Sequence, residues 1–386
     1  MSAGLVDSLC LSFAWTVLLL HIVSHFGLGA AGLVSAAMLV GVALSAPAAS
    51  RLACLLDGRR LLLSAAALES LLRVAVFALL VLGAPLPVIA VCVSVMNVTA
   101  WTGYAGMRAE VATASPETSA LTWYGTGVAA IEAVGAAAAA LLPLIADVES
   151  TSVLAVVTVI YVVGLVPTVV VAGGSPIERT RRRPCTGKRR HLDSWRPTVS
   201  LPVAAGVVLM FAASAPTLLS VGLAAELHGR ASVAYVAVAF TLGSLAAPLM
   251  SWHVQRRRAN GPLVWLLCAL GMTAGWVLAS WSVALMMMAQ AASGFCMTAL
   301  EGLLDTSTAA TAGTGVTGAL ARGTAGRALG SATAVAVLPT AVGHLGLTTV
   351  MMTITGLLGG AVLIVLHRPP QRTHERGRLG AARASS

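Results

Sequence analysis

The chain has 386 residues, of which 58% are hydrophobic and only 10% are charged, and its mean hydropathy is +0.89. A soluble domain needs more polar surface than this composition supplies, so a soluble globular protein is excluded. The net charge of +10 gathers in a few segments between apolar runs, which favours membrane topology over nucleic-acid binding.

Apolar segments follow one another along the whole chain, separated by clusters of Gly, Pro and charged residues. Each has about 20 residues, enough to cross a hydrocarbon core about 30 Å thick, and lipid forces such a segment to be helical. The sequence therefore predicts an all-α polytopic membrane protein with twelve transmembrane helices in two pseudo-symmetric six-helix halves. The predicted spans are 9–28, 30–50, 61–83, 86–107, 121–145, 152–172, 199–221, 232–252, 262–280, 282–304, 322–342 and 346–366.

The positive charges predict the orientation of these spans. With a cytoplasmic N-terminus, 22 of the 24 Lys and Arg residues fall at inner turns, in the central linker or in the tail. Only Arg73 and Arg230 fall elsewhere. This distribution predicts a multi-pass protein of the inner (cytoplasmic) membrane with both termini in the cytoplasm, where anionic lipid attracts the basic segments. We expect a monomer without a nucleic-acid partner.

The six cysteines form no CxxC pair, so neither a zinc site nor a disulfide framework is predicted, and we expect them to be packing residues. No GxxxxGK[ST] loop occurs either, which leaves the chain without a recognisable ATP site. We expect no cofactor and no metal. Transport would then be driven by an ion gradient, by the gradient of the substrate or by a partner protein.

The longest polar stretch between spans is 174–198, and its Gly, Pro and Arg residues predict a cytoplasmic linker. It separates an N-terminal half (1–173) from a C-terminal half (199–366), and 367–386 has the composition of a basic disordered tail. Segments of the two halves resemble each other at offsets of 201 and 196 positions, which indicates a duplicated six-helix unit.

Twelve spans with a basic central linker resemble the major facilitator superfamily over the whole chain. The stretch RLACLLDGRRLLLSAAALESLLR is similar to the family signature at the turn between helices 2 and 3. The stretch MRAEVATASPETSALTWYGTGVAAIEAVGAAAAALLP (107–143) is similar to the inner turn and helix 5 of the siderophore and macrolide exporter branches. The resemblance implies a secondary transporter, and the second stretch implies an exporter.

The signature turn implies a gating role for Asp57, Arg59 and Arg60. Two positions depart from the family pattern, because Leu55 stands where the signature has Asp and Arg51 where it has its first Gly. The central Arg that drug–proton antiporters carry in helix 4 is absent, and the Gly-Pro pattern of their helix 5 is partial.

Polar and aromatic residues form a stripe on the fourth span. Asn97, Trp101, Tyr104 and Arg108 stand at i, i+4, i+7 and i+11, which places them on one helical face. The family resemblance implies that helices 1, 4, 7 and 10 line the central cavity, so this stripe is a candidate wall of the substrate path. The alternatives are an interfacial aromatic belt with a snorkelling Arg, and hydrogen-bonding glue between helices for Asn97.

The tenth span carries a matching stripe. Gln290, Met297, Glu301 and Asp305 stand at i, i+7, i+11 and i+15, and we include the first three in the predicted substrate path. His21 of the first span, four residues before His25, joins them, since histidine titrates near neutral pH. A metal site for the His pair is not expected, because no third ligand accompanies it.

Carboxyl groups deep in a span are costly unless they are paired, so each calls for an explanation. Glu69 and Arg73 stand at i, i+4 and are predicted to pair as a structural unit. Glu132 has no charged neighbour at helical spacing and is the first candidate for proton coupling, with Glu301 the second.

These features predict a secondary transporter that moves a small organic molecule across the cytoplasmic membrane by alternating access. An exporter driven by a proton or other ion gradient is the leading hypothesis, and an importer of the same fold is the alternative. A polytopic membrane enzyme is less favoured because no loop is rich enough in reactive side chains. A sensor that transports nothing is the remaining hypothesis.

Overall fold

The computed structural model describes residues 2–114, 118–142, 150–175, 200–229, 231–257, 260–311 and 316–367, and this part of the chain is helical almost throughout. The predicted linker lies outside the described residues except for its first two positions, and so does the predicted tail except for His367. The elements are α1 (Ser2–Leu55), α2 (Gly58–Val81), α3 (Leu86–Ala114), α4 (Thr118–Leu141), α5 (Thr151–Val163), α6 (Val166–Gly173), α8 (Leu201–Ala213), α9 (Ala215–Leu218), α10 (Ser220–His228), α11 (Ser232–Arg256), α12 (Pro262–Ala274), the 3-10 helix η2 (Gly275–Leu278), α13 (Val283–Thr311), α14 (Val316–Leu345) and α15 (Leu347–His367).

Within the described residues, each of the twelve predicted spans is largely helical. Among the described residues, eight helices are long and apolar enough to cross a membrane, and shorter apolar segments lie at Ala130–Leu141, Leu201–Ala213 and Pro262–Leu278. The first of the eight, Ser2–Ala49, has 48 residues and is long enough to cross twice. It bends at Gly27, whose φ of 76° is open to glycine and unfavourable for other residues. The first two spans are therefore the two arms of α1.

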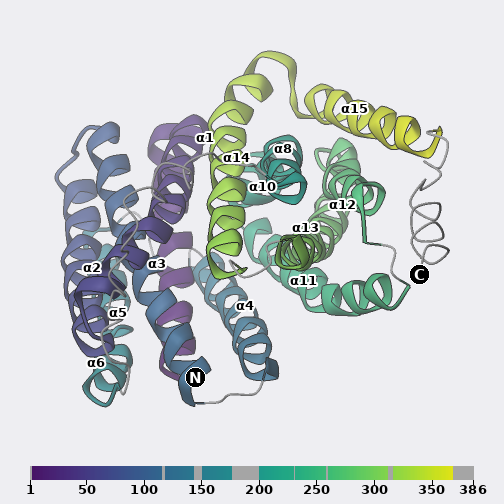
Figure 1. Ribbon diagram of the computed structural model, residues 1–386. Coiled ribbons are helices and arrows are strands. Elements are labelled where there is room, and N and C mark those ends of the chain that lie inside the picture. Colours follow the sequence, from purple (N-terminus) through teal and green to yellow (C-terminus); the bar gives the residue numbers. More distant parts are fainter. Residues whose placement is uncertain are drawn as a thin grey trace, which may run out of the picture.

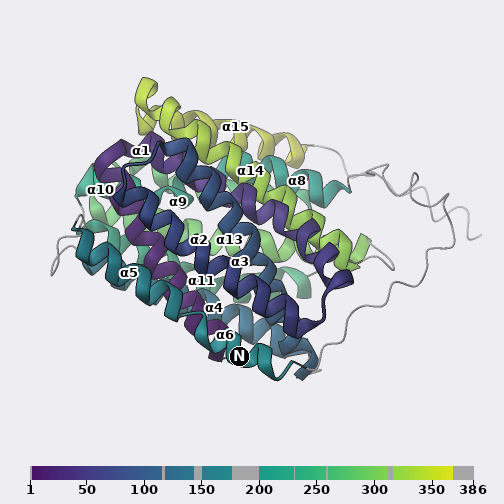
Figure 2. The same ribbon diagram turned by 90° about the vertical axis from the view of Figure 1, so that its left-hand side faces the viewer.

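The helices form two groups that follow the chain order, one from α1 to α6 and one from α8 to α15 (Figures 1 and 2). α2, α5 and α6 stand at the edge of the first group, and α12 and α15 at the edge of the second. The groups meet where α1 packs along α14 and where α4 packs against α11. This arrangement agrees with the two six-helix halves expected from the sequence.

Equivalent glycines bring equivalent helices together in the two groups. A methyl group on Gly41 of α1 would overlap the backbone carbonyl of Ser94 in α3, and one on Gly243 of α11 would overlap the carbonyl of Ala291 in α13. The two glycines are 202 positions apart and their partners 197. The close crossing between the second and fourth spans is thus repeated between the eighth and tenth.

A second pair of crossings shows the same relation. Gly135 of α4 lies directly against the carbonyl of Leu9 in α1, and Gly330 of α14 against the carbonyl of Val207 in α8. The offsets here are 195 and 198 positions. Small residues let helix backbones approach closely in a membrane, so these four glycines define a packing plan that the two groups share.

We call the end of the bundle that carries the bend at Gly27 the outer end, following the predicted orientation. One buried apolar cluster joins the two groups near this end. The first group contributes residues near the bend of α1 and at the end of α4, and the second contributes residues of α9, α10 and α14. Towards the opposite end, the described apolar cluster shared by the groups is small and joins α1 to α14: Val42, Ala43, Ala328 and Ala325. The described contacts therefore hold the groups together mainly at the outer end.

Candidate functional site

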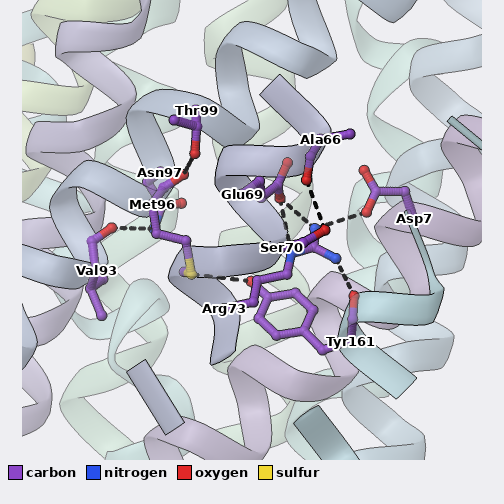
Figure 3. Close-up of polar contacts among 10 residues, drawn as sticks. All are labelled: Asp7, Ala66, Glu69, Ser70, Arg73, Val93, Met96, Asn97, Thr99 and Tyr161. Atoms are coloured by element: carbon purple, nitrogen blue, oxygen red, sulfur yellow. Dashed lines mark hydrogen bonds and ion pairs between the residues drawn. The ribbon is translucent and has the colours of Figure 1, made fainter. Parts of the chain in front are cut away.

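A buried cluster of charges links three spans of the N-terminal group (Figure 3). The Nη2 group of Arg73 donates to Oδ1 of Asp7 at 2.8 Å, and its Nε group donates to Oε1 of Glu69 at 3.1 Å. The side chain of Arg73 is fully buried, that of Glu69 is 3% exposed and that of Asp7 is 26% exposed. Two carboxylates thus share one guanidinium, with Asp7 the member nearest to solvent.

Tyr161 of α5 completes the enclosure of the guanidinium. The Nη1 group of Arg73 donates to the backbone carbonyl of Tyr161, and the centre of the guanidinium lies 3.9 Å from the centre of the tyrosine ring. The hydroxyl of Tyr161 in turn donates to the Met96 sulfur of α3 at 3.8 Å. A cation stacked on an aromatic ring and bonded to carboxylates is stabilised away from water, which lets Arg73 occupy the interior.

The predicted pairing of Glu69 with Arg73 is confirmed, whereas the sequence reasoning missed Asp7. The first span was expected to begin at residue 9, but α1 begins at Ser2 and carries Asp7 within the helix. A signal was present in the sequence, because Asp7, Leu11 and Ala14 stand at i, i+4 and i+7. This spacing places Asp7 on the same face of α1 as the apolar residues Leu11 and Ala14.

Glu132 lies near the charge cluster, although no charged residue neighbours it in sequence. Its carboxyl group interacts electrostatically with that of Asp7 across the α1–α4 contact. The hydroxyl of Ser12 donates to the backbone carbonyl of Glu132 and fixes the two helices at this height. Tyr104 of α3 interacts with the charges of both Glu132 and Arg108. The first coupling candidate therefore interacts with Asp7, one member of the cluster around Arg73.

The stripe predicted on the fourth span divides into two parts. Asn97 is buried against Gly41, and its Nδ2 group donates to the carbonyl of Val93 in its own helix at 2.9 Å. Trp101 is 37% exposed and meets the ring of Tyr104 edge-on, with 5.4 Å between ring centres. The structure thus places Asn97 in a helix contact and Trp101 on an open face of α3.

The stripe predicted on the tenth span is likewise divided. Gln290 is buried, and its Nε2 group donates to the carbonyl of Thr217 at 3.3 Å and to the hydroxyl of Ser220 at 3.0 Å. Met297 packs partly buried against the apolar core of the C-terminal group. Gln290 therefore ties α13 to the seventh span, which is divided into α8, α9 and α10. Met297 is only partly buried, so part of its side chain stays open.

Glu301 lies within reach of an ion pair between α13 and α14. The Nη1 group of Arg327 donates to Oδ1 of Asp305 at 2.8 Å, and Glu301 interacts with both charges. The glycine contacts relate α3 to α13 by 197 positions and α4 to α14 by 195 positions. Asp305 therefore corresponds to Arg108, and Arg327 corresponds to Glu132. The two groups thus carry charges of opposite sign at equivalent places.

The remaining predicted site residues lie at the two ends of the bundle. His21 is buried and its ring stacks on that of His25, with 4.2 Å between centres, close to the outer bend of α1. In the predicted gating turn, a carboxylate oxygen of Asp57 accepts from the backbone N–H of Arg60 at 2.7 Å and caps α2. The side chains of Arg59 and Arg60 are exposed.

Several transporters of known structure share this fold over nearly the whole chain. The nucleoside transporter NupG matches with a TM-score of 0.70 and 9% identity, covering 95% of this chain and 98% of its own. The inward-open xylose transporter XylE from E. coli matches with a TM-score of 0.67 and 12% identity, covering 96% of both chains. A D-xylose-proton symporter matches with a TM-score of 0.68 and 14% identity, covering 96% of this chain and 97% of its own.

No protein-family model and no curated protein sequence matches the chain. At these identities the likeness to solved structures establishes the fold alone. The chain therefore has the same fold as these nucleoside and xylose transporters. These comparisons do not select the siderophore or macrolide exporter branch.

Proposed function

We propose that this protein is a secondary transporter that moves a small organic molecule across the cytoplasmic membrane by alternating access between its two six-helix halves. The observation that carries the proposal is the match of nearly the whole chain to transporters of one fold. The packing supports it, because the described contacts join the halves mainly at the outer end. A fold of this kind exposes a central path to one side at a time.

The substrate path proposed here runs between α3 and α13. On α3 the path is lined by Trp101 and Tyr104, and on α13 by Met297 and Glu301, with His21 nearer the outer end. Asn97 and Gln290 lie at the edge of this path, where both are engaged in hydrogen bonds with protein groups. The open face of Trp101 is the feature that most supports a substrate wall here.

The driving force proposed is a proton gradient, with Glu132 as the first coupling carboxyl group and Glu301 as the second. Asp7 joins Glu132 in this role, since the two carboxyl groups interact and Asp7 is the most exposed carboxyl group of the cluster around Arg73. Two acids sharing one guanidinium leave a surplus carboxylate, and a buried surplus carboxylate favours binding of a proton.

The direction proposed is outward, on the resemblance of residues 107–143 to exporter sequences. Import is the second candidate, because a D-xylose-proton symporter and a nucleoside transporter share the fold. Both directions employ the same alternating access, and the sign of substrate flux relative to proton flux separates them.

Everted membrane vesicles energised to an acidic interior test both proposals. A panel of hydrophobic drugs, iron chelators, pentoses and nucleosides is added singly, while a pH-sensitive dye reports proton release from the lumen. An exporter coupled by antiport releases protons when its substrate enters the lumen, and Glu132→Gln abolishes the release. Substrate-dependent proton uptake in right-side-out vesicles, without release in everted ones, would establish import instead. A panel that moves no protons and no labelled compound in either orientation contradicts coupled transport of these compounds.

A further inference from the structure

At the bend of α1, a hydrogen bond joins the two halves. Because Gly27 leaves the helical conformation with φ 76° and ψ 178°, the backbone N–H of Leu28 begins the second arm without a helical acceptor behind it. Oε1 of Glu226, near the end of α10, accepts from this N–H at 3.1 Å. A carboxylate of the C-terminal half thus caps a helix of the N-terminal half.

The geometry is electrostatically favourable for a contact between separate bodies. The first N–H groups of a helix carry a partial positive charge, and a carboxylate placed there is stabilised by the dipole as well as by the hydrogen bond. A bond of this kind forms at one relative position of the two helices. It is lost as soon as the outer ends of α1 and α10 move apart.

The hydrogen bond lies above an apolar contact that excludes water. A methyl group on Gly222 of α10 would lie 2.6 Å from Cδ1 of Leu28 and 3.3 Å from Cγ2 of Val23, so the absence of a side chain there lets the helices touch. Leu28 is 8% exposed and Leu223 is 1% exposed, and both belong to the cluster that joins the halves. The carboxylate of Glu226 therefore adds a directional hydrogen bond to an otherwise apolar contact between the halves.

We propose that Glu226 is an outer latch, which holds the outer side shut by capping Leu28 and has to be released each time the protein opens outwards. The proposal rests on the alternating access proposed above. In this proposal Glu226 affects the equilibrium between the outward-closed and outward-open states and does not bind the substrate. Its removal raises the population of the outward-open state without changing the chemistry of the substrate path.

Labelling of a single cysteine measures this population without a substrate. All six native cysteines are replaced, and Ala36, which is 8% exposed within the joining cluster, is changed to Cys. A membrane-impermeant maleimide added to whole cells reaches Ala36→Cys only when the outer ends separate. Glu226→Ala is expected to raise the labelling rate about fivefold, the effect of removing about 1 kcal/mol of charge–dipole stabilisation.

The donor is removed separately with Leu28→Pro. Proline lacks the N–H, fits the first position of a helix, and is compatible with the extended ψ of Gly27, so the helix is kept while the bond is lost. Leu28→Ala removes the same packing and keeps the N–H, which makes it the matched control. The double variant Glu226→Ala, Leu28→Pro is expected to label no faster than Leu28→Pro, because each change removes the same bond.

Gly222→Val separates the helices by steric overlap and serves as the positive control for the assay. Suppose that Gly222→Val accelerates labelling, that Glu226→Ala does not, and that Leu28→Pro and Leu28→Ala label at the same rate. The latch proposal is then wrong, and alternating access stands. If the effects of Glu226→Ala and Leu28→Pro multiply in the double variant, the bond is also refuted. Absence of labelling in every variant, Gly222→Val included, would overturn alternating access together with the latch.

Discussion

Arg73 of α2 and Asp7 of α1 lie 66 positions apart in sequence, yet the Nη2 group of the first donates to Oδ1 of the second at 2.8 Å inside the bundle. With Glu69 bonded to the same guanidinium, the bond ties the first span to the third. The cluster is therefore a structural tie between spans, and the carboxyl group of its member Asp7 interacts electrostatically with that of Glu132.

Replacing Arg73 by Met is expected to destabilise the protein by about 3–5 kcal/mol, because Glu69 is then buried, and Asp7 partly buried, without a cation. The measurement is the midpoint temperature of thermal unfolding in detergent, monitored as the loss of monodisperse protein on heating.

The triple change Asp7→Asn, Glu69→Gln, Arg73→Met removes all three charges and is expected to recover most of that stability. A triple variant as unstable as Arg73→Met alone would show that the guanidinium acts through packing with Tyr161 and not through charge.

Changing Glu132 to Gln is expected to abolish substrate flux driven by a pH gradient while leaving the fold intact, because the amide keeps the shape and loses the proton. Counterflow of substrate without a gradient should persist in the variant, which separates coupling from binding. Normal pH-driven flux in Glu132→Gln would remove this residue from the mechanism and leave Asp7 and Glu301 to be tested in the same way.

Gly243→Ala is expected to destabilise the protein by about 1–3 kcal/mol, because the methyl group would overlap the carbonyl of Ala291 and force α11 away from α13. Gly41→Ala should have a similar effect at the equivalent crossing of α1 and α3. Gly356→Ala in α15 is the matched control, since no atom lies within 4 Å of the added methyl group. Equal unfolding temperatures for all three variants would argue against the shared packing plan.

Trp101→Ala is expected to raise KM about fivefold, the equivalent of about 1 kcal/mol of aromatic contact, with little change in unfolding temperature. The reason is that much of this side chain is exposed and its described ring contact is with Tyr104. Asn97→Ala, one helical turn away, should leave KM unchanged because its amide bonds within its own helix. The proposed path along α3 is wrong if KM responds to Asn97 and not to Trp101.

Hydropathy alone predicted twelve helical segments, and their described residues are largely helical, because lipid imposes a helix on every long apolar segment whatever its neighbours are. Local spacing also identified the pair of Glu69 and Arg73, which are one helical turn apart. Spacing could not show that Asn97 faces Gly41 or that Gln290 reaches the seventh span. Which neighbour a helical face meets depends on how the helices cross, and no property of the single helix determines this.

The sequence by itself determined that this is an all-α polytopic membrane protein, and it predicted twelve spans in two related halves, since these depend on composition, length and repeats along one chain. Only the tertiary structure showed that Asp7 shares Arg73 with Glu69, that Asp7 interacts with Glu132, and that Glu226 caps Leu28 from the other half. Each of these contacts joins residues of different spans. Their energies arise from burial and from distances of a few ångströms, which exist only after the helices have packed.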